Sequence, residues 1–309
     1  MTINSSKVLF FTLSAYFDSG VVNYLYFVVI LALYVLIVGC NVLLIVVICV
    51  NKSLHEPMYM FLCSLFVNEL YGSSGLFPLL LTQILSDLHT VSAPFCFLQI
   101  YCVYTYVHIE FCNLVVMSYD RYLAICHPLQ YHSLMTPSKI VKLITLTWLF
   151  PLAESVLGIM SNVYTELCGN IIDKVYCDSF SIVKLSCSYV PTSKYMGIAY
   201  MFTVILGMIV LILYTYIKIL KVSFSGSKQT RQKAVSTCTP HLVSVINFSF
   251  GFFFDVFQSR FDMSHVPHIL RVILSLYFLT CQPLFTPLVY GLNLSKIRSF
   301  SKHFVRGKL

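Results

Sequence analysis

Four long stretches of this 309-residue chain contain no Asp, Glu, Lys or Arg: residues 20–51, 195–217, 234–254 and 272–295. An α-helix needs about 20 mostly apolar residues to cross roughly 30 Å of hydrocarbon, and each stretch reaches that length. A helix is required because lipid offers no hydrogen-bond partner to an open backbone. The chain is therefore predicted to cross a membrane at least four times.

Three further apolar stretches carry one acidic residue each. They are residues 57–85 with Glu69, residues 91–119 with Glu110, and residues 140–160 with Glu154. With 58% hydrophobic and 10% charged residues, the chain is too apolar to be disordered and too poor in charge for a water-soluble enzyme. We predict an all-α membrane protein, a seven-transmembrane helix bundle over residues 21–292, flanked by an N-terminal segment 1–20 and a tail 293–309.

The basic residues predict the orientation. With the N-terminus outside, 14 of the 20 Lys and Arg residues fall on the cytoplasmic side, as the positive-inside rule favours. We expect a multi-pass plasma membrane protein with an extracellular N-terminus. We therefore attribute its net charge of +8 to cytoplasmic loops that contact membrane lipid and a cytosolic partner, and not to binding of nucleic acid. The tail after Tyr290 alternates basic and apolar residues, which predicts either a short amphipathic cytoplasmic helix or a frayed basic tail.

Four of the 12 cysteines, Cys96, Cys168, Cys177 and Cys187, fall on the predicted extracellular side, where disulfides form. Four cysteines allow three pairings, which the spacing alone does not rank. The other cysteines lie within spans or on the cytoplasmic side, where free thiols are expected. Asn4 opens an Asn-Ser-Ser sequence in the extracellular segment, so N-glycosylation is expected there.

Three motifs carry a family resemblance. Residues 54–59 read LHEPMY, residues 117–126 read MSYDRYLAIC and residues 233–242 read KAVSTCTPHL. They resemble the LHxPMY, MxYDRYxAIC and KAxSTCxxHL motifs of the odorant (olfactory) receptor family of rhodopsin-like (class A) G-protein-coupled receptors, and the resemblance covers nearly the whole chain. The NELYG block at 68–72 and FSFG at 248–251 are most similar to fish-type members.

The resemblance implies two disulfides, Cys96–Cys177 and Cys168–Cys187. It also implies that Arg121, at the cytoplasmic end of span three, is released when the helices open and then contacts a G protein. Position alone would also allow a positive-inside anchor, but the ten-residue motif around Arg121 favours the switch. The implied coupling and switch residues are Asp120, Arg121, Tyr122, Tyr216, His241 and Tyr290.

Glu69 and Glu110 are carboxylates within predicted spans, where an unpaired charge costs several kcal/mol. Rhodopsin-like receptors hold a sodium ion near the matching positions, and Asn41 of span one is expected nearby. The three residues are therefore predicted to hold sodium, to share a proton between the carboxyl groups, or to form a structural hydrogen-bond network. Two departures from the family bear on this choice. Glu69 stands where Asp is usual, and Thr286 replaces an Asn. No other cofactor is expected.

The resemblance also implies a ligand pocket in the outer half of the bundle. Its residues would be Val103, Tyr104, Val107, His108, Tyr200, Val204, Phe252 and Val256. For any single residue of such a stripe, ordinary packing between helices is the more common explanation.

The function that follows is that of an odorant receptor. A small odorant would bind in the outer half of the bundle and activate a heterotrimeric G protein of the stimulatory type, which raises cAMP. The alternatives are a non-odorant class A receptor and an ion-coupled membrane transporter. No sequence motif of a hydrolase, zinc protease or nucleotide-binding enzyme is present, so no enzymatic activity is expected.

Overall fold

The computed structural model places most of the chain. It describes residues 8–16, 20–163, 166–187, 191–226, 228–259, 261, 265–293 and 296–299. Asn4 and the tail beyond residue 299 lie outside the described residues, so glycosylation and the amphipathic tail helix stay predictions.

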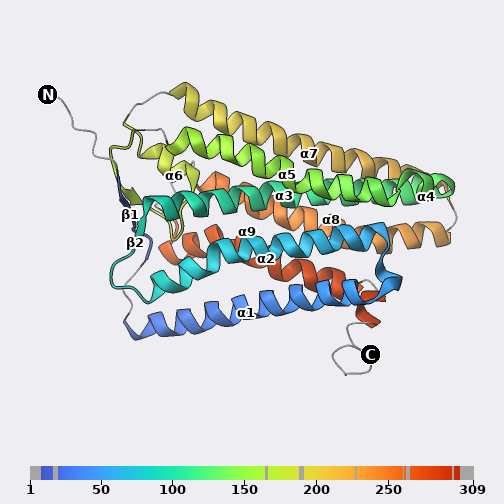
Figure 1. Cartoon of the computed structure of the whole chain (residues 1–309), viewed down its shortest axis with the longest axis horizontal. Helices are drawn as coiled ribbons and strands as arrows, with labels where there is room; N and C mark the ends of the chain where they lie inside the picture. Colours follow the sequence, from blue (N-terminus) through green and yellow to red (C-terminus); the bar gives the residue numbers. More distant parts are fainter. Residues whose placement is uncertain are drawn as a thin grey trace.

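Seven long helices form one bundle (Figure 1). They are α1 (Val21–Val50), α2 (Pro57–Ile84), α3 (Ala93–Cys126), α5 (Pro137–Val163), α7 (Pro191–Ser225), α8 (Lys228–Gln258) and α9 (His268–Asn293). The short elements are η1 (Lys52–Leu54), η2 (Pro128–Gln130), α4 (Tyr131–Leu134) and α6 (Ser179–Lys184). Helix α3 packs against α2, α5 and α7, and α8 packs against α9.

Six of these long helices are apolar enough over their length to cross a membrane. The seventh, α2, carries Asn68, Glu69 and Ser73 in its middle, all buried, and these polar side chains lower its average hydropathy. Its polar groups face protein and not lipid, which is where membrane helices tolerate them. The predicted seven-helix bundle is confirmed, and its helices begin and end close to the expected spans.

One end of the bundle carries a small sheet that the all-α prediction missed. Strand β1 (Phe10–Leu13) pairs antiparallel with β2 (Thr90–Ser92) and parallel with β3 (Ile171–Ile172). Strands of two to four residues leave no alternating pattern long enough to recognise. We call this end, which also holds α6, the sheet end. The opposite end, which holds α4, is the Arg121 end (Figure 1).

Two disulfides fasten the segment 166–187 at the sheet end. Cys96 of α3 is joined to Cys177, and Cys168 is joined to Cys187, the same pairs that the family resemblance implied. Cys96 and Cys177 are fully buried in an apolar cluster with Phe11, Val91 and other side chains of the strands. Covalent and apolar contacts thus hold this loop over the end of α3.

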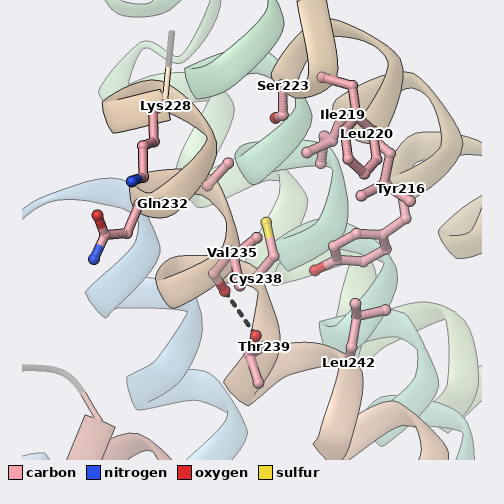
Figure 2. Close-up of a pocket in the computed structure, with 12 residues that line it drawn as sticks. Tyr216, Ile219, Leu220, Ser223, Lys228, Gln232, Val235, Cys238, Thr239 and Leu242 are labelled. Atoms are coloured by element: carbon pink, nitrogen blue, oxygen red, sulfur yellow. Dashed lines mark hydrogen bonds between the residues drawn. The ribbon is translucent and has the colours of Figure 1, made fainter. Parts of the chain in front are cut away.

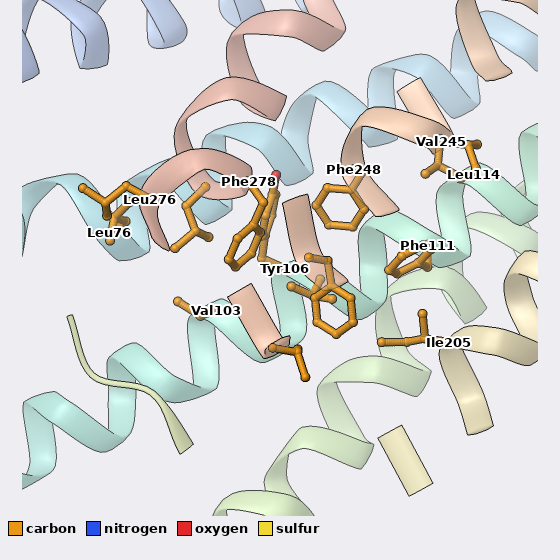
Figure 3. Close-up of a cluster of buried hydrophobic side chains, with 14 of the residues drawn as sticks. Leu76, Val103, Tyr106, Phe111, Leu114, Ile205, Val245, Phe248, Leu276 and Phe278 are labelled. Atoms are coloured by element: carbon orange, nitrogen blue, oxygen red, sulfur yellow. The ribbon is translucent and has the colours of Figure 1, made fainter. Parts of the chain in front are cut away.

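Aromatic side chains fill the centre of the bundle (Figure 3). The ring of Phe248 on α8 lies 5.0 Å from Phe111 and 5.8 Å from Tyr106, both on α3. Helix α2 approaches α3 closely because Gly72 has no side chain, and a Cβ at that position would collide with the ring of Tyr106. The residues that position Tyr106 therefore come from two neighbouring helices, α2 and α8.

Candidate functional site

A cavity of about 30 Å³ lies at the sheet end between α3, α8, α9 and the loop that Cys177 fastens. Six of the eight predicted ligand-binding residues line it. They are Val103, Tyr104, Val107, His108, Phe252 and Val256. The spacing of 103, 104, 107 and 108 places these four side chains on neighbouring faces of α3, which is why the sequence could find them.

Tyr200 and Val204 of α7 do not line this cavity. Tyr200 is 52% exposed, whereas Ile205 is fully buried, so this part of α7 turns a different side chain toward the core. These two residues therefore lie outside the cavity wall in this conformation, and their part in ligand binding stays a prediction. A one-residue difference in helix rotation, about 100°, is enough to place them outside the wall.

The cavity has further lining residues that are not among the eight predicted ligand-binding residues. They are Tyr176, Asp178, Phe180, Asp255 and Phe278. Asp178 directly follows Cys177, so the disulfide from Cys177 to α3 could have predicted that Asp178 lies near this cavity. Asp255 was visible as a charge at the end of a span, but nothing in the sequence separates a solvated helix end from a buried one.

A buried lysine joins the loop to α8 beside this cavity. The Nζ of Lys174 lies 3.0 Å from Oδ1 of Asp255 and 3.5 Å from Oδ2 of Asp178, and 5.1 Å from the ring centre of Tyr176. Burial alone would lower the pKa of Lys174, but the Asp178 and Asp255 carboxylates raise it well above its ordinary value. Lys174 therefore stays protonated and holds the two carboxylates.

His108, which is only 4% exposed, also lines this cavity. Its Nδ1 is 3.3 Å from Oε2 of Glu154 on α5. Its Nε2 makes no hydrogen bond within the described part of the chain. If Nδ1 carries the proton toward the carboxylate, the neutral ring leaves Nε2 as a hydrogen-bond acceptor.

Glu69 and Glu110 meet in the middle of the bundle, and both are fully buried. Glu110 accepts hydrogen bonds from Nδ2 of Asn68 at 2.9 Å and from Nε2 of Gln282 at 3.0 Å. Glu69 accepts one from the hydroxyl of Tyr106 at 2.9 Å. Donors thus occupy both oxygens of Glu110 but only one oxygen of Glu69.

Several buried oxygens around these two carboxyl groups have no hydrogen-bond partner among the described residues. They are Oε1 of Glu69, Oδ1 of Asn41, Oδ1 of Asn68, Oγ of Ser73 and Oγ1 of Thr286. Asn41 itself is tied to the backbone, since its Nδ2 donates to the carbonyls of Ile37 and Pro283. Among the described residues, no three His, Cys, Asp or Glu side chains gather as a metal site. This is an oxygen-rich site with two carboxylates, which suits a hard monovalent cation or a shared proton.

At the Arg121 end, Arg121 binds the neighbouring Asp120, with Nε 3.1 Å from Oδ2. The other oxygen of Asp120 accepts a hydrogen bond from the hydroxyl of Tyr131 in α4 at 2.6 Å. Burial, followed by the bond to Asp120, raises the pKa of Tyr131 above its ordinary value. Asp120, fully buried, therefore holds both Arg121 and the short α4 helix.

A second contact links three helices near Arg121. Nε2 of His241 on α8 lies 2.9 Å from the carbonyl oxygen of Leu114 on α3, so this nitrogen must donate. Nδ1 then accepts from the hydroxyl of Tyr216 on α7, 2.8 Å away. A neutral histidine can make both bonds at once. His241 thus joins the three helices that the predicted switch would separate.

The remaining predicted switch residues are placed differently. The hydroxyl of Tyr122 lies 3.1 Å from Nε2 of His127, just beyond the end of α3. Tyr290 of α9 is fully buried in an apolar cluster that includes Leu65 and Met117.

A cleft of about 600 Å³ separates α7 and α8 at the Arg121 end (Figure 2). Its wall is almost wholly apolar, and Figure 2 shows Tyr216 and Ile219 of α7 facing Cys238 and Leu242 of α8. The cleft is thus far larger than the cavity at the sheet end. At the Arg121 end, α7 and α8 are joined mainly by the Tyr216–His241 hydrogen bond and are otherwise loosely packed.

The fold of the bundle defines the class of protein. The structure matches that of squid rhodopsin with a TM-score of 0.74 over 94% of this chain and 88% of the rhodopsin chain, at 17% identity. The bundle therefore has the rhodopsin fold.

Sequence comparison defines the family within that fold. The sequence model of the olfactory receptor family matches residues 30–308. Human olfactory receptor 11H4 is 36% identical over 85% of this chain and 81% of its own length. Human olfactory receptor 11A1 is 33% identical over 92% and 89%, and mouse olfactory receptor 4E2 is 30% identical over 97% and 96%. The chain belongs to the olfactory receptor family, so it is a receptor and not an enzyme. The fish-type assignment stays a prediction.

Proposed function

We propose that this chain is an odorant receptor of the plasma membrane, which binds a small odorant in the sheet-end cavity and activates a heterotrimeric G protein through the Arg121 end. The observation that supports this most is the convergence of six predicted ligand-binding side chains on one cavity. Packing alone could bury them, but it would not leave a cavity with two carboxylates in its wall.

The sheet end would face the outside of the cell. Both disulfides lie there, where the medium is oxidising, and the free thiols described by the structure lie elsewhere in the bundle. The Arg121 end would face the cytoplasm and its anionic lipid, as the excess of basic residues favours.

The cavity must enlarge before an odorant can bind. Its volume of about 30 Å³ is well below the roughly 300 Å³ of the smallest typical ligand pockets. Binding would therefore favour a conformation in which the sheet ends of α3, α8 and α9 lie further apart. A ligand shifts the equilibrium only as far as it prefers that conformation. At the other end, the loose contact between α7 and α8 gives the bundle a place to open for the G protein.

A cAMP assay in cells tests this function. We expect some polar or apolar odorants to raise cAMP, and Arg121→Ala to abolish the response at equal surface expression. Lys221→Ala is the matched control, because Lys221 is an exposed basic residue at the same end. Equal responses in both variants would mean that Arg121 is only a topological anchor.

We further propose that Glu69 and Glu110 hold a sodium ion, with Asn41 and Thr286 beside them. The unpartnered buried oxygens support this, because Na⁺ prefers several oxygen ligands. Thermal unfolding in sodium chloride and in choline chloride tests it. Sodium should raise the melting temperature of the unaltered receptor but not that of Glu110→Ala. A sodium effect that persists in Glu110→Ala would contradict the ion site. A dependence on pH without one on sodium would favour the shared proton.

A further inference from the structure

The sheet-end cavity offers a ligand hydrogen-bond acceptors and negative charge. Two carboxylates, Asp178 and Asp255, and the buried His108 line it. Lys174 is not among the lining side chains, and its single positive charge faces both carboxylates. One negative charge therefore remains in excess at the wall.

His108 provides an independent sign of a ligand. It is 4% exposed and lines the cavity, yet its Nε2 has no hydrogen-bond partner within the described residues. When the neutral ring directs its Nδ1 proton at Glu154, 3.3 Å away, this nitrogen is an acceptor. Buried acceptors without partners cost free energy, so the site is complementary to a molecule that brings N–H donors.

Lys174 already shows that an ammonium group fits here. Its Nζ lies 3.0 Å from Asp255 and 3.5 Å from Asp178, and the face of Tyr176 lies 5.1 Å away. Carboxylates and an aromatic face together are the groups that bind organic cations. The rest of the cavity wall is hydrocarbon, from Val103, Val107, Phe252, Val256 and Phe278.

We propose that the ligand of this receptor is a small primary amine, whose ammonium group replaces that of Lys174 on Asp255 and whose hydrocarbon part packs on the apolar wall. This inference rests on the proposed function, because it takes the cavity as the odorant site. A carboxylate ligand would meet excess negative charge, and an alcohol would leave Asp255 without a cation once Lys174 moved.

The same exchange would open the cavity. Lys174 belongs to the loop that the disulfides fasten, whereas Asp255 belongs to α8. Their ion pair therefore ties α8 to the loop. An amine that takes Asp255 releases this tie, so α8 becomes free to move relative to α3. A ligand of another class would have to break the ion pair without replacing it, which costs much more in a buried site.

Thermal unfolding of the purified full-length receptor, with butylamine, butanol and butyrate as probes, tests the ligand class without any G protein. Butylamine should raise the melting temperature, and butanol and butyrate should not. Asp255→Asn should weaken butylamine binding roughly 30-fold or more, the lower end for loss of one partner in a buried charge pair. Lys174→Met, which removes the competing ammonium group, should tighten it about tenfold.

Asp173→Asn is the matched control for the loop. Asp173 is 70% exposed and pairs with Arg271 at 3.7 Å, so its loss should leave butylamine binding unchanged. If Asp255→Asn lowered the melting temperature without ligand but left the shift produced by butylamine unchanged, Asp255 would only support the fold. The comparison of the three probes on the unaltered receptor does not depend on whether any variant folds.

The outcomes separate the two proposals. Stabilisation by butyrate or butanol and not by butylamine overturns the amine ligand, and a cAMP response to those compounds would leave the odorant receptor intact. Stabilisation by none of the three also overturns it. Stabilisation by butylamine without any rise in cAMP supports the amine ligand and contradicts the proposed coupling.

Discussion

Two pairs of buried carboxylates occupy this bundle, and only one of them has a cation beside it. At the sheet end, Asp178 and Asp255 share the ammonium group of Lys174. In the middle, Glu69 and Glu110 are surrounded by Tyr106, amides and unpartnered oxygens. The first pair is neutralised mostly by the chain itself. The second needs a proton or an ion from outside, because two close carboxylates resist double ionisation.

The difference has a structural cause. Lys174 is carried by a loop with its own disulfide to α3, so a long side chain can enter the bundle from its end. Glu69 and Glu110 lie midway along α2 and α3, where helix packing leaves no room for a lysine from a loop. Gly72 brings the two helices together at that level. The two pairs should therefore respond in opposite ways to neutral substitutions.

The largest effect is expected for Lys174→Met, which leaves two buried carboxylates without their cation. It should lower the free energy of unfolding by roughly 3–5 kcal/mol, as for other buried pairs that lose one partner. Thermal unfolding of the purified receptor measures it. Adding Asp255→Asn should recover part of the loss, because it removes one of the unpaired charges. A double variant that is less stable than Lys174→Met would contradict this account.

The pH dependence of that loss follows from the same contact. The pKa of Lys174 is raised in the folded state, so the stabilisation is fully present below its unfolded pKa of about 10.4. It disappears only as the pH rises through the higher folded value. The difference between the unaltered receptor and Lys174→Met should thus persist up to about pH 9, and it should shrink on acidification, because protonation of the buried carboxylates removes the unpaired charges from Lys174→Met.

Gly72→Ala is expected to have the next largest effect, and it acts on the second pair. The new methyl group would collide with the ring of Tyr106, whose hydroxyl donates to Glu69. Overpacking of this kind costs about 1–3 kcal/mol. Thermal unfolding should show the loss, and any sodium effect should weaken with it. Gly39→Ala is the control, since a Cβ there meets nothing within 4 Å.

Positions of the helices could be predicted because lipid excludes charge: gaps between charged residues indicated four spans, and apolar stretches with one acidic residue each indicated the other three. The lining residues on α3 followed from helical spacing. The position of Tyr200 did not follow from helical spacing, because the rotation of α7 depends on contacts with other helices that its own sequence does not reveal. The strands depend on pairing between residues far apart in the sequence, such as Phe10 with Ser92 and Thr12 with Ile171, and they are too short for a pattern.

The Lys174–Asp255 contact could not be predicted for a related reason. Both residues lie where a span meets a loop, and such charges usually face water. Their burial depends on the path of the loop, which the Cys96–Cys177 disulfide and the three-stranded sheet determine together. Family resemblance gave the disulfide, but it gave no information about which loop residue would then point at α8.

Glu69→Gln tests the Glu69–Glu110 pair, and unlike Lys174→Met it should not destabilise the fold. Glu69 has one unpartnered oxygen, whereas both oxygens of Glu110 accept N–H donors. Without sodium, Glu69 is therefore the carboxyl group that would carry a shared proton, and in choline chloride a neutral amide should replace it with a change of less than about 1 kcal/mol. Thermal unfolding should show equal or greater stability, together with loss of any sodium effect. A loss as large as that of Lys174→Met would mean that Glu69 is ionised and paired.

The smallest effect is expected for an ion pair at the surface. Lys296 binds Oε1 of Glu56 at 2.7 Å at the Arg121 end, and both side chains are at least half exposed. The hydrogen bond to Glu56 raises the pKa of Lys296. Water and salt nevertheless screen such a pair, so Lys296→Ala should change stability by less than about 1 kcal/mol. The effect should vanish in high salt, whereas that of Lys174→Met should persist, because a buried pair is screened far less. Equal salt dependence in the two variants would mean that water reaches Lys174, and the contrast between the buried and exposed pairs would then be lost.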